Sequence, residues 1–502
     1  MIRISGRELT EMGRDITTPF LLSILPETNS TTETANDQAS SKADIEISRL
    51  IRLLPGKRLV AVGQWEGQAV IAKLFFQNGH WKRHLERERA GTQLIQKAEI
   101  LSPRALLFAR MAGDDGGVMI NEYLAESQGA GDLLETSQFK SQFLTAKILD
   151  LIISCYDKGL WQNDIHLNNF LIYRDQVYLI DGADVKAEAE GGPVPEINRL
   201  KNLALFFAQF PVWHDQELET LMANVNHQGS AYKKSQSSSE LAELVTEARN
   251  GRIDAYSKKL TRSSTAHFFQ HRSDRFVVCD RAILSNEFND FIDNPNRYID
   301  QGEMVKAGNT STVVIVTIQQ NRYLLKRYNV KSLSHDFRRI LGRLLGHNRA
   351  LNSWRFALIL SLLGINTAKP LMMLERRAFR WIPRESYFLC EVIEGNTVAE
   401  IIEDESFDSS KKSTVISAFR GLFSAMAECR ISHGDLKATN FIFTKGKLYV
   451  LDLDAMKRHK DKKSFRKSFQ KDINRFINNW AGKKEFESIT QQAVEATKSF
   501  SN

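Results

Sequence analysis

Two sets of oxygen-bearing side chains recur at the same spacing along this chain of 502 residues. Each set has an aspartate, an asparagine five residues later and a second aspartate twelve residues after that. Amide and carboxylate oxygens are the ligands that Mg²⁺ prefers, and a carboxylate can orient a hydroxyl and take its proton. The combination predicts phosphoryl transfer from ATP, with Mg²⁺ as the second cofactor. The sets are Asp164, Asn169 and Asp181, and Asp435, Asn440 and Asp452.

An isolated lysine precedes each set in a β-rich stretch. The first stretch, RLVAVGQWEGQAVIAKLFF at 58–76, predicts a hairpin that turns at Gly67 and carries Lys73 in its return strand. The second stretch, 306–329, predicts two strands, and Lys326 lies in the later one. Phosphoryl transfer needs such a cation to hold the phosphates of the nucleotide. Each half of the chain therefore supplies the required residue types in the same order.

The elements that must position these residues also repeat. Two stretches, 169–181 (NFLIYRDQVYLID) and 440–452 (NFIFTKGKLYVLD), each predict a strand, a tight polar turn and a second strand. Further on, EINRLKNLALFF at 196–207 and DINRFINNW at 472–480 are predicted to begin a helix each, with Ile-Asn-Arg in common. The chain is too long for one ordinary core, so this repetition predicts two domains of one fold.

An apolar strand with an acidic end lies midway in each half of the chain. The segments are VMINEYL at 118–124 and YFLCEVIEG at 387–395. We expect each to connect two lobes of one domain, and we expect Glu122 and Glu391 to lie beside the bound nucleotide.

In this order the motifs resemble the protein-kinase-like fold, in its small-molecule and bacterial branches. The second copy resembles the Kdo and heptose kinases of the lipopolysaccharide core over residues 285–485. That likeness is carried by HGDLKATNF, by LDLD in place of DFG, by DINRF and by RALNSWRFALILSLLGINTAKP. The first copy resembles the fold more loosely, over 45–225. The resemblance implies an α+β chain with two bilobal domains in tandem, each with a small antiparallel β lobe and a larger helical lobe.

The resemblance also implies roles for the repeated residues. In the second copy Asp435 would be the catalytic base, with Lys437 near the transferred phosphoryl group. Lys326 would hold the α and β phosphates, and Asn440 and Asp452 would bind the metal. The first copy would use Asp164, His166, Lys73, Asn169 and Asp181 in the same roles.

The copies depart from the family pattern at different places. The fold usually pairs the strand lysine with a helix glutamate, for which the first copy offers Glu88, with Glu86 as an alternative. Alignment places Ser353 opposite Glu88, so the second copy has no obvious glutamate. In the first copy Gln162-Asn163 replaces the His-Gly that precedes the catalytic aspartate. A half that keeps the fold without catalysis is therefore an alternative for either copy.

Composition divides the chain further. Residues 24–43 are polar and predict a flexible loop, and the polar stretch 226–240 is expected to end the first domain. The predicted divisions are an N-terminal segment with a polar loop at 1–44, a first kinase-like domain at 45–225, a bridge at 226–284 and a second kinase-like domain at 285–502.

The charge of the chain is uneven. Residues 301–502 hold 34 Lys and Arg against 20 Asp and Glu, a net charge of +14, whereas residues 1–300 carry −6. Basic residues gather in 322–349 and 456–471, which favours contact with anionic headgroups or a phosphorylated glycolipid core. A solvated basic face is the alternative, and nucleic acid is not expected because no aromatic–basic RNA-binding motif is visible. The first stretch predicts an amphipathic helix through Phe337, Ile340, Leu341, Leu344 and Leu345, with Arg338, Arg339 and Arg343 among them.

The remaining composition indicates a cytoplasmic protein. Four cysteines are scattered without a CxxC pair, which argues against a zinc site or a disulfide framework. The longest apolar run, FALILSLLGI at 356–365, is shorter than a membrane span and predicts a buried helix. A peripheral contact with the inner membrane is a further expectation.

These observations favour an ATP-dependent kinase that phosphorylates a sugar hydroxyl, heptose or Kdo, of the lipopolysaccharide inner core. A protein or another small molecule as acceptor is one alternative. The other is a pseudokinase adaptor that binds nucleotide or a partner without catalysis.

Overall fold

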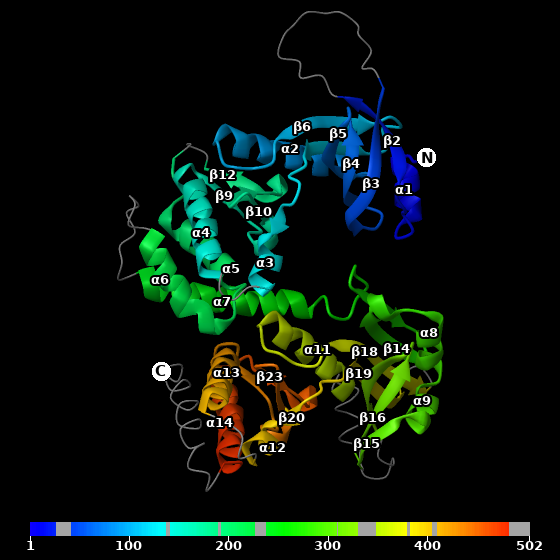
Figure 1. The fold of residues 1–502 in the computed structure, drawn as a ribbon, viewed down its shortest axis with the longest axis vertical. Coiled ribbons are helices and arrows are strands. Elements are labelled where there is room, and N and C mark those ends of the chain that lie inside the picture. The colour runs from blue at the N-terminus through cyan, green and yellow to red at the C-terminus, as the bar shows by residue number, and fades with distance from the viewer. Residues whose placement is uncertain are drawn as a thin grey trace, which may run out of the picture. The chain divides into compact units, whose positions relative to one another are not determined.

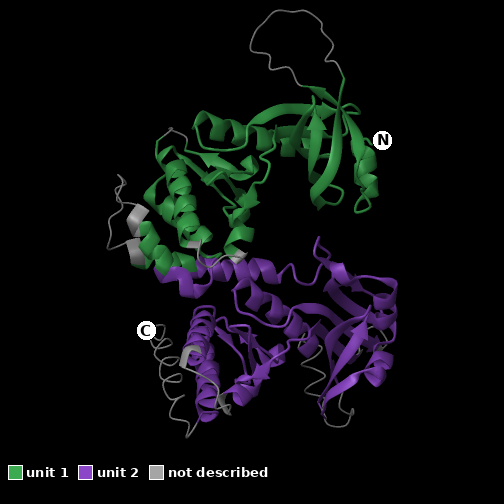
Figure 2. Ribbon diagram, viewed as in Figure 1, with its two compact units in different colours: residues 1–209, 217–245 green, residues 210–216, 246–502 purple. Residues whose placement is uncertain are grey.

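The chain forms two compact units in a computed structural model (Figure 2). Unit 1 comprises Met1–Gln209 and Glu217–Val245, and unit 2 comprises Phe210–Gln216 and Thr246–Asn502. The structure describes residues 1–26, 42–136, 141–188, 192–225, 237–308, 310–329, 348–378, 382–403 and 409–480.

The β lobe of unit 1 is a closed barrel (Figure 1). Neighbouring strands pair antiparallel, and β2 also pairs with β6, which removes the free edges of the sheet. Alternate side chains point inward, and Ile45, Ala61, Ala72 and Val118 are fully buried there. Around the barrel the strands are β2 (Phe20–Pro26), β3 (Ala43–Leu54), β4 (Arg58–Trp65), β5 (Gln68–Phe75), β7 (Gly117–Glu122) and β6 (Ala105–Met111).

The N-terminal segment contributes strands and a helix to this barrel, although the sequence pattern divides the chain at residue 44. Strand β1 (Ile2–Arg3) pairs with β2, and helix α1 (Gly6–Met12) begins at Ser5 with a capping box. Apolar side chains of α1 and β2 join the barrel core, Leu9 among them. Of the predicted flexible loop, 24–26 and residue 43 lie in strands, and 27–41 lies outside the described residues.

The helical lobe of unit 1 follows β7. It contains the predicted hairpin, and β8 extends that hairpin to a small sheet. Both turn residues, Arg174 and Asp175, have positive φ, as a two-residue hairpin turn requires. Helix α2 (Trp81–Lys97) precedes β6 in the chain and lies beside the barrel. The elements after β7 are β8 (Gln128–Gly129), α3 (Ala130–Thr136), α4 (Ser141–Asp157), β9 (Leu160–Gln162), β10 (Phe170–Tyr173), β11 (Gln176–Leu179), β12 (Val185–Ala187), α5 (Glu196–Phe207) and α6 (Asp215–Val225).

Unit 2 carries an open sheet of seven antiparallel strands, and two short helices, α8 and α9, supply apolar side chains to its core. Its first two strands lie before residue 285, so the compact unit begins earlier than the predicted domain. In sheet order the strands are β13 (His267–His271), β14 (Arg275–Asp280), β18 (Pro370–Ala378), β19 (Ile382–Glu391), β17 (Asn321–Tyr328), β16 (Ser311–Ile318) and β15 (Glu303–Ala307), and the two helices are α8 (Asn286–Asp293) and α9 (Pro295–Gln301).

The helical lobe of unit 2 packs around aromatic side chains. The Phe419 ring centroid lies 4.9 Å from those of Phe441 and Phe476, which joins α13, the hairpin and α14. The elements are α11 (Arg349–Leu362), which contains 356–362 of the predicted buried run, α12 (Val398–Glu403), α13 (Ser409–Glu428), β21 (Ile431–Ser432), β22 (Phe441–Thr444), β23 (Lys447–Val450), β24 (Lys457–Arg458) and α14 (Lys462–Asn478).

Helix α14 begins ten residues before the predicted start at 472. Asp461 sets the start, because its side chain accepts a hydrogen bond from the Ser464 backbone at 2.7 Å. In unit 1, by contrast, the first motif does begin α5, directly after Pro195. The shared Ile-Asn-Arg therefore lies at different depths in the two helices.

A buried arginine ties an earlier segment of the chain into unit 2. Arg249 of α7 (Ser237–Ser257) has a side chain only 2% exposed, and it pairs with Asp215 at 2.7 Å and with Glu428 of α13. A buried charge needs such partners. The last residues of the polar stretch that is expected to end the first domain, 237–240, are helical and begin α7. Residues 226–236 and the predicted amphipathic helix with Phe337 lie outside the described residues.

Among the described residues no helix is both long and apolar enough to cross a bilayer.

Candidate phosphoryl-transfer sites

The second aspartate of each set has an unusual backbone. Asp181 lies at φ 73° and ψ 75°, and Asp452 lies at φ 56° and ψ 57°. Residues other than glycine adopt this left-handed region rarely. The cost is of order 1 kcal/mol or more, and such residues gather at functional sites. Both units therefore hold this side chain in the same special conformation, directly after a hairpin.

In unit 1 the strand lysine is paired with two carboxylates. Lys73 Nζ forms an ion pair with Glu88 of α2 and another, at 3.1 Å, with Asp181. Glu86, the alternative partner, is exposed. Burial lowers the pKa of a lysine, but the charges of Glu88 and Asp181 outweigh it, so the pKa of Lys73 lies above its usual value. The same lysine lowers the pKa of Asp181.

Helix α2 approaches this site closely because of one glycine. A Cβ on Gly91 would lie 1.7 Å from the Gly182 carbonyl oxygen. The contact brings the Gly182 amide to 3.2 Å from Glu88 Oε1, where it donates a hydrogen bond. Glu88 thus joins α2 to the strand lysine and to the loop that follows Asp181.

In unit 2 the lysine takes a different acidic partner. Lys326 Nζ pairs with Asp452 and, at 3.0 Å, with Asp454. Asp454 also accepts from Arg349 of α11 at 2.7 Å. Burial lowers the pKa of Lys326, but Tyr328, Asp454 and Asp452 outweigh it, and the pKa is raised. Lys326 also outweighs burial at Asp452, whose pKa is lowered.

Ser353, which alignment places opposite Glu88, contacts Tyr328. Its hydroxyl lies 3.0 Å from the Tyr328 hydroxyl, and Lys326 Nζ lies 5.0 Å from the Tyr328 ring centroid. The position two residues after the metal-type aspartate is Ala183 in unit 1 and Asp454 in unit 2. The second carboxylate that pairs with the strand lysine therefore comes from a helix in unit 1 and from the loop in unit 2. In the sequence, the second aspartate of LDLD is the residue that indicates this difference.

The catalytic-type aspartate of unit 2 lies between two cations. Asp435 Oδ2 is 3.0 Å from Lys437 Nζ, and Asp435 Oδ1 is 2.8 Å from Nη1 of Arg475 on α14. Lys437 thus lies beside the catalytic-type aspartate. Arg475 was not predicted as a site residue, although it belongs to the DINRF motif.

The loop that carries Asp435 is held from behind. Asp472 of α14 accepts hydrogen bonds from the backbone amides of His433, at 2.6 Å, and Gly434, at 2.9 Å. Burial raises the pKa of Asp472 to about 6. His433 is fully buried and its ring Nε2 lies 3.1 Å from the Leu451 carbonyl, while burial lowers its pKa. The neutral ring therefore donates to the strand that precedes Asp452.

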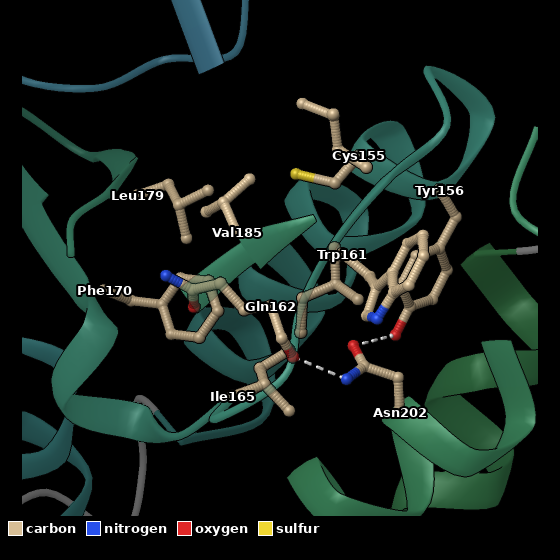
Figure 3. A pocket seen from close by; sticks show the side chains of 11 residues that line it. Cys155, Tyr156, Trp161, Gln162, Ile165, Phe170, Leu179, Val185 and Asn202 are labelled. Atoms are coloured by element: carbon tan, nitrogen blue, oxygen red, sulfur yellow. Dashed lines mark hydrogen bonds between the residues drawn. The ribbon is translucent and has the colours of Figure 1, made fainter. Parts of the chain in front are cut away.

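In unit 1 a glutamine makes the hydrogen bond that the histidine makes in unit 2. Gln162 Nε2 donates to the carbonyls of Ile180, at 2.9 Å, and Asp181, at 2.8 Å. Asn202 of α5 donates to the Gln162 carbonyl at 2.7 Å and accepts from the Tyr156 hydroxyl at 2.9 Å (Figure 3). The Gln-Asn departure therefore keeps the link between the loop and the strand. Asn202 of α5 contacts the loop as Asp472 of α14 does.

The asparagines are oriented alike in the two units. Asn169 Nδ2 donates to the Asp164 carbonyl, and Asn440 Nδ2 donates to the Asp435 carbonyl, each at 2.8 Å. With its nitrogen engaged, each amide keeps Oδ1 for a cation. This donor set fits Mg²⁺, which binds through one or two protein oxygens, waters and substrate phosphates. Among the described residues there is no cluster of three or more His, Cys, Asp or Glu that could hold a metal.

Unit 1 differs at its catalytic-type aspartate. Asp164 is exposed, and within the described part of the chain it forms no ion pair. His166, at the position of Lys437, accepts a hydrogen bond through Nδ1 from the Asn168 amide at 3.2 Å. The surroundings of Asp164 and Asp435 therefore differ although their spacing is the same.

A cavity of about 510 Å³ opens beside the Lys73 pair in unit 1. That volume is within the usual range for small-molecule sites. Glu122 lines it and accepts a hydrogen bond from the Arg104 amide at 3.2 Å. Glu391 ends β19 as Glu122 ends β7. Other lining residues include Val60, Ile71, Met119, Asn121, Tyr123, Leu179 and Asp181.

A second cavity of unit 1 lies behind the catalytic-type loop, among Tyr156, Gln162 and Asn202 (Figure 3). Its volume is about 20 Å³, room for one water molecule and no larger ligand. It is a packing gap beneath the loop.

The geometry of unit 2 agrees with comparison to known proteins. Residues 296–499 match the family model of the lipopolysaccharide kinase (Kdo/WaaP) family. Members of that family are kinases that phosphorylate sugar hydroxyls of the lipopolysaccharide core, and the match places unit 2 among the kinases. The match begins within α9 and includes the strand lysine, the catalytic-type loop and α14.

Two further comparisons complete this result. No curated protein matches the chain. Among solved structures, "WaaP in complex with acyl carrier protein" is similar at 13% identity and a TM-score of 0.32, over 41% of this chain and 88% of that one. The family model alone, over residues 296–499, indicates the lipopolysaccharide kinase family for that stretch.

Proposed function

We propose that unit 2 transfers the γ-phosphoryl group of ATP to a sugar hydroxyl, on heptose or Kdo, of the lipopolysaccharide inner core. The observation that carries the proposal is the Asp435 loop within the stretch that matches the family. Its carboxylate is held between Lys437 and Arg475, next to an asparagine and a left-handed aspartate that suit a metal.

The residues divide the reaction among them. Asp435 orients the acceptor hydroxyl and takes its proton as the new oxygen–phosphorus bond forms. The bond from the γ-phosphorus to the bridging oxygen breaks, and ADP leaves with that oxygen. Lys326 holds the α and β phosphates, and Lys437 offsets charge on the transferred group. Mg²⁺, held by Asn440 and Asp452, supplies further neutralisation of the phosphate oxygens when bound.

We infer that unit 1 is a second bilobal domain of the kinase-like fold and that it binds ATP. The support is the Lys73–Glu88–Asp181 arrangement beside the cavity of about 510 Å³. Because Asp164 is exposed and lacks the cations that surround Asp435, a pseudokinase role, nucleotide binding without transfer, is the second candidate for this unit.

We place the reaction at the cytoplasmic face of the inner membrane, where ATP and a growing glycolipid meet. The predicted domain bounds and the expectation against nucleic acid remain predictions.

An acceptor panel tests the proposal. The full chain is incubated with γ-labelled ATP and Mg²⁺, with core lipopolysaccharide lacking core phosphate, free sugars or a generic protein substrate in separate reactions. We expect label on the lipopolysaccharide only, and hydrolysis should release it from heptose or Kdo. Label on protein, with none on lipopolysaccharide, would overturn the assignment.

A further inference from the structure

A row of four cations runs along α14 toward Asp435. The row, here called the basic ridge, is Lys463, Lys467, Lys471 and Arg475, and all four are exposed. Residues four apart are neighbours on a helix surface. Each step rises about 6 Å and turns about 40°, so the ridge is about 18 Å long.

The ridge winds from the outward face of α14 to the catalytic-type loop. The opposite face is buried through Phe465, Phe469 and Phe476. Arg475 lies at the flank of the helix, where its guanidinium is 2.8 Å from Asp435 Oδ1. One end of the ridge therefore touches the atom that would accept the hydroxyl proton.

Helix stability does not account for the ridge. The first turn of α14 contains no acidic residue, although negative charge is favoured there and positive charge is not. Like charges four apart also destabilise a helix. Among the described residues, Lys463, Lys467 and Lys471 form no ion pair or hydrogen bond through their side chains. Within the part of the chain that the structure describes, these three charges have no acidic partner, and they are exposed.

The corresponding helix of unit 1 lacks the ridge. Asn202 of α5 contacts its loop as Asp472 of α14 does, and the two residues are 270 positions apart. With the same offset, the last three ridge positions correspond to Ile197, Lys201 and Leu205 of unit 1. Ile197 is 43% exposed and Leu205 is 37% exposed. The row of cations therefore belongs to unit 2 alone and does not follow from the fold.

We propose that the basic ridge binds phosphate groups that the acceptor glycolipid already carries, and so brings its sugar hydroxyl to Asp435. This inference rests on the proposed function. ATP needs only the cations beside its own phosphates, whereas a row about 18 Å long matches an acceptor with charges spread along a saccharide. Exposed cations also raise the encounter rate with such a polyanion.

The test compares two triple variants of the full chain. Lys463→Gln/Lys467→Gln/Lys471→Gln removes the ridge and leaves Arg475 in place. Its control removes the same charge from exposed lysines elsewhere in unit 2, at Lys258, Lys445 and Lys447. We expect the ridge variant to raise KM for the phosphorylated acceptor at least tenfold, with kcat and KM for ATP unchanged. The control should stay within twofold of wild type.

A binding measurement separates this inference from the proposed function. The ridge substitutions are placed in Asp435→Asn, and co-sedimentation is measured with vesicles of phosphorylated lipopolysaccharide, of the chemically dephosphorylated form, or of phosphatidylglycerol. We expect the ridge to strengthen binding at least tenfold on the first vesicles only. Wild type that labels no lipopolysaccharide contradicts the proposed function, while this binding still reports on the ridge. Equal loss on phosphatidylglycerol, or no loss on the first vesicles, overturns the inference.

Discussion

At the residue scale, the two units solve one electrostatic problem in two ways. A buried lysine needs a carboxylate besides the metal-type aspartate. Unit 1 supplies it from α2 through Glu88, with Ala183 in the loop, and unit 2 supplies it from the loop through Asp454, with Ser353 on the helix. In both units the second carboxylate keeps the strand lysine charged and oriented.

Asp454 is therefore expected to be necessary for transfer by unit 2. Asp454→Ala leaves Lys326 and Arg349 without this shared carboxylate, so the lysine loses its orientation toward the phosphates. We expect kcat to fall about tenfold to a hundredfold, because small misplacement of a positioning group has that effect. Steady-state kinetics check this, and Ser353→Glu in the same chain should recover part of the loss.

The matched control is Asp461→Ser, which removes one charge near the same loop while a good helix cap remains. It should keep at least half of the wild-type rate. Full activity in Asp454→Ala would show that Lys326 needs no second carboxylate.

The pH dependence of unit 2 follows from Asp472. Above about pH 6 its carboxylate is ionised and accepts from both backbone amides. As the pH falls through about 6 it takes a proton and loses an acceptor site, so the loop that carries Asp435 loosens. We expect kcat to fall below about pH 6, measured as a profile of kcat against pH. Asp472→Asn should give a low and flat profile.

The effect of Asp472 on the free energy of unfolding has the opposite pH dependence to its effect on kcat. The usual pKa of this carboxyl is 3.8 and burial raises it to about 6, so the folded state binds the proton more tightly. This group alone makes the free energy of unfolding fall as the pH rises from about 4 to about 6. Loss of activity below pH 6 is then not unfolding caused by Asp472. An Asp472→Asn variant that keeps the acid limb would contradict the assignment.

At the element scale, contact between α2 and the Asp181 loop depends on Gly91. Gly91→Ala places a methyl group against the Gly182 carbonyl, so the helix must move away. Overpacking of this kind costs about 1–3 kcal/mol. We expect weaker ATP binding by unit 1, measured as a smaller nucleotide-dependent rise in melting temperature, and an unchanged rate of lipopolysaccharide phosphorylation.

Gln93→Ala, on the exposed side of the same helix, is the control and should leave the nucleotide response as in wild type. An unaltered response in Gly91→Ala would show that the close approach of α2 is not needed for ATP binding.

Elements with local causes were predicted well from the sequence. The hairpins at 170–179 and 441–450 follow from short strands and tight turns, and Gly67 turns the β4–β5 hairpin as expected. Barrel closure through β2 and β6 was missed, because that pairing joins strands far apart in the chain. The predicted start of α14 is wrong because it relied on the shared Ile-Asn-Arg, which lies inside the helix that Asp461 caps.

For the candidate site, too, features that depend on local sequence are predicted, and features that depend on contacts between distant segments are not. Spacing in the chain predicts the repeated Asp, Asn and Lys positions, and the structure brings Lys73 to Asp181 and Lys326 to Asp452. Arg475 and Asp454 were missed as site residues, because their roles appear only when α14 and the loop meet Asp435 and Lys326. Gln162 departs from the family pattern in the sequence. Its amide nevertheless donates a hydrogen bond to the Ile180 carbonyl, as the His433 ring does to the Leu451 carbonyl in unit 2.

At the scale of the whole molecule, the units share a plan and differ in surroundings. Unit 1 has the Lys73–Glu88 pair and a cavity of nucleotide size, with an exposed Asp164. Unit 2 has Asp435 between two cations and the basic ridge that ends there, in the half of the chain that carries a net charge of +14. This contrast predicts that transfer belongs to unit 2.

The most direct test is the rate of phosphoryl transfer to core lipopolysaccharide in four full-length proteins: wild type, Asp164→Asn, Asp435→Asn and the double variant. Loss of a general base costs about a hundredfold to ten-thousandfold. We expect that loss in Asp435→Asn and in the double variant, with Asp164→Asn within about threefold of wild type and a retained ATP-dependent rise in melting temperature in all four. Full activity in Asp435→Asn, with loss in Asp164→Asn, would contradict the account.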